Sequence, residues 1–180
     1  GNIGKAQDFK SIIKVAEMSK DKNINWIIIG SGRNEEWVKD QIKEKKLENT
    51  IYLLGKYPLD AMPNMYSNAD ALLISLKKSK ILSLTAPGKI QSYLAFGKPI
   101  LSMMDGEGSR IVMESKAGFA ASSGDSKTLL DNALKMKGMQ RNELKKMGYN
   151  GKKYYEMNFE RKFLINKLIK IFSTIKSSQS

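Results

Sequence analysis

Two patterns of hydrophobic residues alternate along the chain. Short apolar runs, typical of buried strands, occupy 25–29, 51–54, 69–76, 99–104 and 118–121. Between them apolar residues recur every three or four positions, which predicts helices over 8–20, 34–46, 89–96, 108–116 and 126–136. A short helix is expected to begin at Pro58, whereas 77–86 shows no period and predicts a loop.

Strand and helix alternate five times, which predicts an α/β fold: a Rossmann-like doubly wound parallel sheet with helices on both faces. We expect one domain over 1–180 with a helical tail at about 140–176, and fraying of the last four residues. Ligands of such sheets bind at the carboxyl ends of the strands. The loops of interest are therefore 30–34, 55–58, 76–88 and 104–109.

The amino-acid composition excludes several kinds of reactive site. The chain contains neither cysteine nor histidine, which excludes disulfides, Cys/His zinc sites and His-based triads within these residues. No apolar run approaches the roughly 20 residues of a membrane-spanning helix. The lack of cysteine fits a reducing compartment, so we expect a cytoplasmic location.

Positive charge is concentrated at the end of the chain. From Lys135 onward, twelve Lys and Arg oppose three Glu, which gives +9 of the overall +13. This concentration of positive charge is explained equally well by a solvated surface helix and by an anionic binding partner. Among partners we favour an anionic membrane, reached peripherally at its inner face, over nucleic acid, because no nucleic-acid motif is present.

Two turns that each follow a strand and open a helix are candidate anion sites. The first reads G-S-G-R at 30–33, and Glu35 stands where a dinucleotide fingerprint needs its third glycine. Arg33 can pair with phosphate, although a plain turn remains an alternative. The second reads T-A-P-G-K at 85–89, where free N–H groups and Lys89 can hold a diphosphate without a metal.

Two further turns carry polar groups. The segment 105–108 reads D-G-E-G, and its carboxylates suit ribose hydroxyls, although Asp105 can equally cap the next helix. The segment 1–5 reads G-N-I-G-K and forms another two-glycine turn before a helix. Ligand and plain-turn interpretations stay open for both.

Five segments together resemble the C-terminal domain of GT-B glycosyltransferases of family 4. They are G-N-I-G-K-A-Q at 1–7, I-I-G-S-G at 28–32, L-L-G-K-Y-P at 53–58, S-N-A-D-A-L-L-I at 67–74 and P-G-K-I-Q-S-Y-L-A-F-G-K-P-I at 87–100. The last is similar to the signature of one branch of that family. The segments occur in the family's order and span most of the chain.

The resemblance implies a retaining transferase that uses an activated sugar and needs neither cofactor nor metal. The similar branch builds bacterial surface polysaccharides, including lipopolysaccharide, often from UDP-linked N-acetylated sugars. By analogy, Gly55, Tyr57 and Leu59 face the base, Lys89 and Arg33 steady the diphosphate, and Gly4 and Lys5 lie by the phosphates. The residues expected beside the donor sugar are Ser83, Leu84, Thr85 and Ala86.

The sequence departs from the family at one place. Many members carry two glutamates eight positions apart before the G-K-P segment, and those positions here are Leu84 and Ser92. Ser92 can still bind a ribose hydroxyl, though more weakly than a carboxylate does. We hypothesise that Glu107 takes over the ribose.

In the family the acceptor is bound by a separate N-terminal domain, so this chain alone is expected to bind donor without transferring sugar. The final helix either packs onto that domain or onto this domain's own sheet. Two alternatives remain: half of a sugar-nucleotide 2-epimerase, which usually needs histidine, and a non-catalytic nucleotide- or nucleic-acid-binding module.

Overall fold

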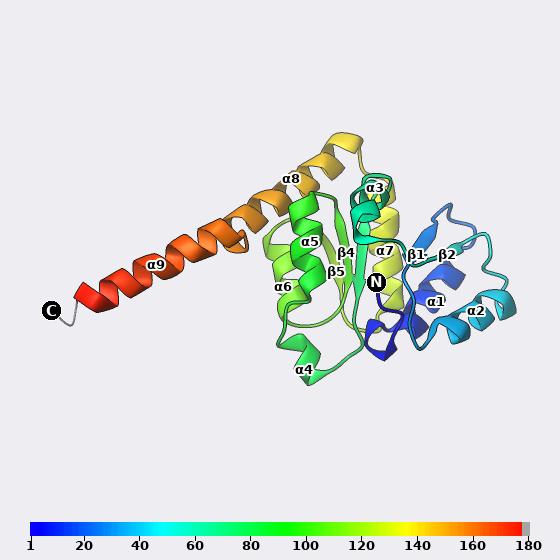
Figure 1. The fold of residues 1–180 in the computed structure, drawn as a ribbon. Helices are drawn as coiled ribbons and strands as arrows, with labels where there is room; N and C mark the ends of the chain where they lie inside the picture. Colours follow the sequence, from blue (N-terminus) through cyan, green and yellow to red (C-terminus); the bar gives the residue numbers. More distant parts are fainter. Residues whose placement is uncertain (178–180) are drawn as a thin grey trace.

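The computed structural model describes residues 1–177, and it places helices and strands in the predicted order (Figure 1). The strands are β1 Trp26–Ile29, β2 Ile51–Gly55, β3 Leu72–Ser75, β4 Ile100–Met103 and β5 Gly118–Ala121. The main helices are α1 Phe9–Met18, α2 Glu35–Glu44, α5 Gly88–Phe96, α6 Glu107–Glu114, α7 Ser126–Lys137, α8 Arg141–Asn158 and α9 Arg161–Ser177. Shorter helices are η1 Lys5–Gln7, η2 Leu59–Ala61, α3 Met62–Ser67 and α4 Lys80–Ser83.

All paired strands are parallel, as predicted, but they form two hydrogen-bonded sets. β1 pairs with β2, and β3, β4 and β5 pair in that order. No ladder joins β1 to β3 among the described residues. The sequence pattern predicts strands without predicting which of them pair, so this division was not foreseen.

Side-chain alternation along the strands explains why helices cover both faces. In β4, Leu101 and Met103 are buried in the layer that holds α1 and α7. Ile100 faces the opposite layer, which holds α5 and α6. Figure 1 shows α5 and α6 on one side of β3–β5 and α7 on the other. Because successive side chains of a strand point to opposite faces, one strand contributes to two cores. The doubly wound α/β prediction is confirmed.

One predicted loop contains a helical turn. α4 lies inside 77–86, where Ser79 Oγ accepts a hydrogen bond from the Leu82 N–H at 3.4 Å. Such capping satisfies an otherwise free N–H at a helix start. A single turn is too short to show a hydrophobic period, which is why the pattern did not reveal it.

The predicted tail helix is two helices. α8 ends at Asn158 and α9 begins at Arg161. The amides of Phe159 and Glu160 both donate to the Tyr155 carbonyl oxygen, at 2.8 and 3.0 Å, so the regular helical pattern stops there. Of the four residues expected to fray, Ser177 ends α9 and the other three lie outside the described residues.

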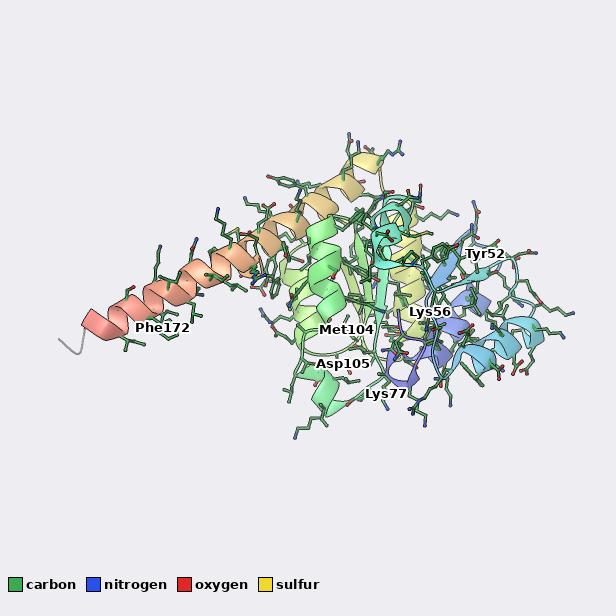
Figure 2. All side chains as sticks on the ribbon, in the orientation of Figure 1. Tyr52, Lys56, Lys77, Met104, Asp105 and Phe172 are labelled. Atoms are coloured by element: carbon green, nitrogen blue, oxygen red, sulfur yellow. The ribbon has the colours of Figure 1, made fainter. Side chains whose placement is uncertain are left out.

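α9 extends away from the sheet as an arm, so the expectation that it packs on this domain's own sheet is wrong (Figure 1). Its apolar side chains are exposed: Leu168 is 50% and Phe172 61% accessible. Figure 2 shows Phe172 on this arm. Within residues 1–177 no helix combines the length and apolar character needed to cross a bilayer.

α8 is held against α5 by close backbone contact. Gly97 ends α5 in the left-handed conformation (φ 76°), and a Cβ on Gly148 would overlap the Gly97 carbonyl oxygen. One turn further, a Cβ on Gly151 would lie 3.0 Å from the Ala117 Cβ and 3.1 Å from Leu94 Cδ2. The small residues let the two helices approach.

We expect Gly148→Ala to lower the free energy of unfolding by about 1–3 kcal/mol, because the methyl group meets backbone that cannot move freely. The better helix propensity of alanine, worth about 1 kcal/mol, offsets only part of this. The measurement is equilibrium urea unfolding. Gly138→Ala is the matched control, since its Cβ would meet nothing closer than 3.6 Å; equal effects of both substitutions would contradict the prediction.

Candidate functional site

The turn formed by residues 1–4 packs on the β1–α2 turn at the carboxyl end of β1. The Ile3 N–H donates to the Ser31 carbonyl oxygen at 2.9 Å, and the Ile3 carbonyl oxygen accepts from the Asn34 N–H at 3.0 Å. Gly4 is buried, and its N–H donates to Gln7 Oε1 at 3.1 Å. The turns 1–4 and 30–34, which the sequence predicted separately, therefore pack together as one unit.

The glycines of the G-S-G-R turn serve this packing. Gly30 has a φ of 141°, and a Cβ there would overlap Gly1. A Cβ on Gly32 would overlap the Ile3 carbonyl oxygen. The sequence left open whether this turn approaches a ligand or is a plain turn; in the structure the chain's own N-terminal turn makes the close approach.

Lys89 lies beside this turn. It is the second residue of α5, and the N–H groups of the first two residues, Gly88 and Lys89, precede the first hydrogen bond of the helix, in which the Ile90 N–H donates to the Pro87 carbonyl oxygen at 2.9 Å. A Cβ on Gly1 would overlap Lys89 Nζ, so the ammonium lies against the N-terminal residue. The side chain as a whole is exposed, yet the partial burial of its ammonium lowers the pKa of Lys89. A partly desolvated cation and a helix N-terminus at one place favour an anion.

The two other predicted cations lie on the packed turns. Arg33 and Lys5 are exposed, and neither makes an ion pair within the described part of the chain. Arg33 directly follows Gly32, which touches Ile3, so both cations belong to neighbouring turns. Their predicted contacts with phosphate stay predictions.

The predicted base-binding loop also lies at the carboxyl ends of the strands, next to the turn after β1. The Gly55 carbonyl oxygen accepts from the Gly30 N–H at 2.7 Å, and Gly55 turns the chain with a φ of 74°. Beyond it, Tyr57 is 43% and Leu59 88% exposed. Both side chains are free to contact a planar base, and their assignment stays a prediction.

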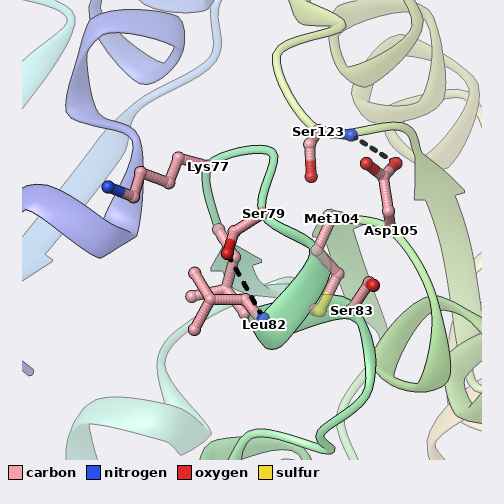
Figure 3. Close-up of a pocket in the computed structure, with 8 residues that line it drawn as sticks. Lys77, Ser79, Leu82, Ser83, Met104, Asp105 and Ser123 are labelled. Atoms are coloured by element: carbon pink, nitrogen blue, oxygen red, sulfur yellow. Dashed lines mark hydrogen bonds between the residues drawn. The ribbon is translucent and has the colours of Figure 1, made fainter.

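A small crevice lies between the β3 and β4 loops (Figure 3). It has essentially no interior volume, and it is lined by Leu76, Lys77, Ser79, Leu82, Ser83, Met104, Asp105 and Ser123. Small-molecule pockets begin at roughly 300 Å³. A larger groove of about 350 Å³ lies between α1 and α2, away from the predicted loops. We place the site by its chemistry rather than by size, at the strand ends.

Asp105 does not cap α6. Its Oδ1 accepts from the Ser123 N–H at 3.0 Å, which ties the β4 loop to the β5 loop. Gly106 directly precedes α6 and has a φ of 75°, and a Cβ there would overlap the Ser83 carbonyl oxygen. Ser83 is thereby held close to the start of α6. Sequence reasoning missed Ser79, Lys77 and Ser123; their one signal was their position just after β3 or β5.

The remaining predicted donor residues differ in how free they are. Leu84 is 75% exposed, and Thr85 Oγ1 donates to the Leu82 carbonyl oxygen at 3.2 Å. Ala86 is half-buried, whereas Ser92 is exposed on α5. Leu84, Thr85 and Ala86 lie between α4 and α5, whereas Ser92 lies within α5. Their contacts with the donor stay predictions.

Glu107 already has a partner. Both its oxygens accept from Arg110, at 2.7 and 2.8 Å, and the hydrogen bond to Arg110 lowers the pKa of Glu107. A ribose hydroxyl would have to use the lone pairs that remain. The sequence did not reveal this, because Glu107 and Arg110 only meet once α6 forms.

Comparison with known proteins finds one matching family and several similar solved structures. The family model described as "Glycosyl transferases group 1" matches residues 1–154. TarM of S. aureus, in complex with UDP and alpha-GlcNAc-glycerol, is similar with a TM-score of 0.80 at 14% identity, covering 96% of this chain and 34% of that one. Anabaena HepE in complex with UDP gives 0.79 at 16% identity, covering 97% and 47%.

A third similar structure is the C-terminal domain of LpcC, a glycosyl transferase group 1 family protein from Francisella tularensis. Its TM-score is 0.70 at 15% identity, with 89% of this chain and 84% of that chain covered. No curated protein matches the sequence. The chain thus spans about a third of TarM and just under half of HepE, but most of the single LpcC domain.

We expect the affinity for a diphosphate such as UDP to fall as the pH rises, and to begin falling below the ordinary lysine pKa of 10.5. Burial lowers the pKa of free Lys89, whereas the anion binds the protonated form and raises it again. Rising pH therefore removes the binding form. The measurement is calorimetric titration between about pH 8 and about pH 10.

The control for that pH profile is Lys89→Arg, whose guanidinium stays charged across this range. Its affinity should change little with pH. A wild-type profile as flat as that of the arginine variant would remove Lys89 from the binding site.

Proposed function

Because the chain belongs to the glycosyl transferases group 1 family, we propose that it is the donor-binding half of an enzyme that moves a sugar from a nucleoside diphosphate sugar. The observation that carries the proposal is the position of Lys89. Its ammonium and the first turn of α5 adjoin the packed turns 1–4 and 30–34 at the carboxyl ends of parallel strands. Such ends are where ligands of this fold class bind.

The proposed chemistry follows from that charge. Breaking a sugar–phosphate bond leaves negative charge on the diphosphate, and fixed donors that meet this charge lower the barrier. Lys89 and the free N–H groups of α5 supply such donors, with Arg33 and Lys5 on the adjoining turns. We therefore propose that no metal or cofactor is needed, so that a chelator leaves donor affinity unchanged.

The finer assignment is a proposal from similarity. UDP is present in the TarM and HepE structures, and TarM holds an N-acetylated glycoside. These support UDP as the nucleotide and an N-acetylated sugar as the group transferred. From the motif resemblance we further propose a retaining mechanism, in a family 4 enzyme of surface-polysaccharide synthesis such as lipopolysaccharide. The acceptor, a polysaccharide or lipid-linked glycan, would be bound by a separate N-terminal domain.

The two alternatives have less support. A sugar-nucleotide 2-epimerase usually needs histidine, and this half has none. A nucleotide- or nucleic-acid-binding module explains the basic tail but not the family match over residues 1–154. Donor binding by a transferase domain accounts for both the match and the site.

We expect the chain to bind UDP saturably, to bind GDP and ATP more weakly, and to show little change between low and high salt. A contact with one diphosphate involves few charges, whereas multi-phosphate binding weakens steeply with salt. Lys89→Ala should weaken UDP binding about 10- to 100-fold, since one charge-assisted hydrogen bond contributes about 1.5–3 kcal/mol. In an enzyme that includes the acceptor domain, it should lower kcat about 100- to 1000-fold.

The matched control is Lys43→Ala, an exposed lysine in the last turn of α2. It should leave UDP affinity unchanged. A loss in kcat of less than about tenfold for Lys89→Ala would contradict the catalytic role. In the same titration, an unchanged affinity of Glu107→Gln would eliminate the ribose contact proposed for that carboxylate.

We also propose that α9 holds the protein peripherally at an anionic membrane on its cytoplasmic side. From residue 161 to 170 the helix carries four basic residues and no acidic one, and its exposed apolar residues include Ile165, Leu168, Ile169 and Phe172. A basic amphipathic helix of this kind binds the interface of anionic bilayers. The other candidate partner of this surface is the acceptor domain.

The chain should co-sediment with vesicles of phosphatidylglycerol and not with vesicles of phosphatidylcholine. The pair of substitutions Leu168→Asn and Phe172→Asn should abolish binding, because it removes apolar contact and leaves the charge. Lys145→Gln with Lys146→Gln on α8 is the control and should bind as the unchanged chain does. Binding that survives the α9 substitutions would show that α9 is not the membrane contact, and the acceptor domain would remain as its candidate partner.

A further inference from the structure

The groove of about 350 Å³ between α1 and α2 lies outside the loops predicted to bind the donor. Its volume is within the range of roughly 300–1,000 Å³ that small-molecule sites have. One wall is a single face of α1, because Lys10, Ile13, Lys14 and Glu17 recur at intervals of three or four residues. Figure 1 shows α1 and α2 beside each other, next to β1 and β2.

The two helices are tied together at both ends of the groove. At one end, the turns 1–4 and 30–34, which lead into the helices, are joined by backbone hydrogen bonds. At the other end, Lys45 directly follows α2, and its Nζ donates to both carboxylate oxygens of Glu17, at 3.2 and 3.4 Å. The groove is therefore built into the fold, and a ligand can enter it with little rearrangement.

Apolar side chains and one free donor make up the inner surface of the groove. Ile13 is 2% exposed, and the Trp37 ring is half-buried against the same core. The indole N–H of Trp26 donates to Ser19 Oγ at 2.9 Å, whereas that of Trp37 has no partner within residues 1–177. No fully buried side-chain nitrogen in this range lacks a partner, so the Trp37 N–H is open to solvent.

The charge around the groove is positive. Lys10 and Lys14 are exposed, lie one helical turn apart on α1, and form no ion pair in the described part of the chain. Glu17 is the one carboxylate among the lining residues, and Lys45 already pairs with it. Three lysines against one glutamate favour an anion over a cation at this place.

We propose that this groove is a second ligand site, which binds a small amphiphilic anion. The apolar or aromatic body of the ligand packs on Ile13 and the Trp37 ring, where burial of flat apolar surface is favourable. Its carboxylate, sulfonate or phosphate group lies beside Lys10 and Lys14, with the Trp37 N–H as a further donor. The volume suits a small molecule rather than a macromolecule.

The test is a titration of the isotope-labelled chain with naphthalenesulfonate, followed by the NMR signals of the indole N–H groups of its two tryptophans. The Trp37 signal should shift saturably. The Trp26 signal should stay in place, because that ring is buried and its N–H is bonded to Ser19. The neutral naphthalenesulfonamide has the same apolar body and should bind at least about tenfold more weakly, since it lacks the charge.

Removing the two free lysines should reduce this preference for the anion. Lys10→Gln with Lys14→Gln should weaken sulfonate binding at least about fivefold, and should leave sulfonamide binding unchanged. The control is Lys43→Gln with Lys46→Gln, which removes the same charge from exposed lysines outside the groove. This control should bind the sulfonate as the unchanged chain does.

A substitution of opposite sign should strengthen binding, which misfolding cannot do. Glu17→Gln removes the carboxylate and releases Lys45, so the affinity for the sulfonate should rise about two- to fivefold. A loss of affinity in this variant, measured while its Trp26 signal is unchanged, would contradict the proposal.

A Trp37 signal that does not move, or equal affinities for the sulfonate and the sulfonamide, would overturn the proposal. So would a Trp37 signal that moves with protein concentration before any probe is added, because a second copy of the chain would then cover the groove. Saturating UDP should leave the titration unchanged, and competition would make the groove part of the donor site. The titration itself contains no nucleotide, so a failure of UDP binding would leave its result intact.

Discussion

β4 is hydrogen-bonded on both edges and buried on both faces, and the rest of the structure depends on this constraint. Its four residues pair in register with β3 on one side and β5 on the other. Gly118 is required beside it, since a Cβ there would overlap the Ile100 carbonyl oxygen. Because all three strands run in parallel, their carboxyl ends lie at the same end of the sheet. The loops that follow these strands are therefore brought together there, whatever their sequence.

At this edge the candidate site is shaped by backbone contact. Gly30, Gly32 and Gly106 each stand where a side chain would overlap a neighbouring segment. These contacts bring the turns 1–4 and 30–34 together, and hold α4 against the start of α6. Lys89, Arg33 and Lys5 extend from the backbone that these contacts hold in place. The role proposed for these cations requires no rearrangement of the backbone that carries them.

Two surfaces of the described chain have no neighbour within residues 1–177. No ladder joins β1 to β3, and the apolar side chains of α9 are exposed. Free strand edges and apolar surface are both unfavourable in water. The solved structures similar to this chain include proteins more than twice as long.

The sequence alone determined the strands, the main helices up to α7 and their order. Apolar runs predicted all five strands, and residues such as Pro87 and Gly97 marked the ends of α5, because local backbone preference and hydrophobic period depend only on neighbouring residues. The resemblance of its motifs to a transferase family agrees with the family match. What it could not determine were contacts between distant segments. The division of the sheet, the use of Gly30 and Gly32 by the N-terminal turn, the Glu107–Arg110 pair and the exposure of α9 were decided only by the tertiary structure, since each depends on which segments meet in space.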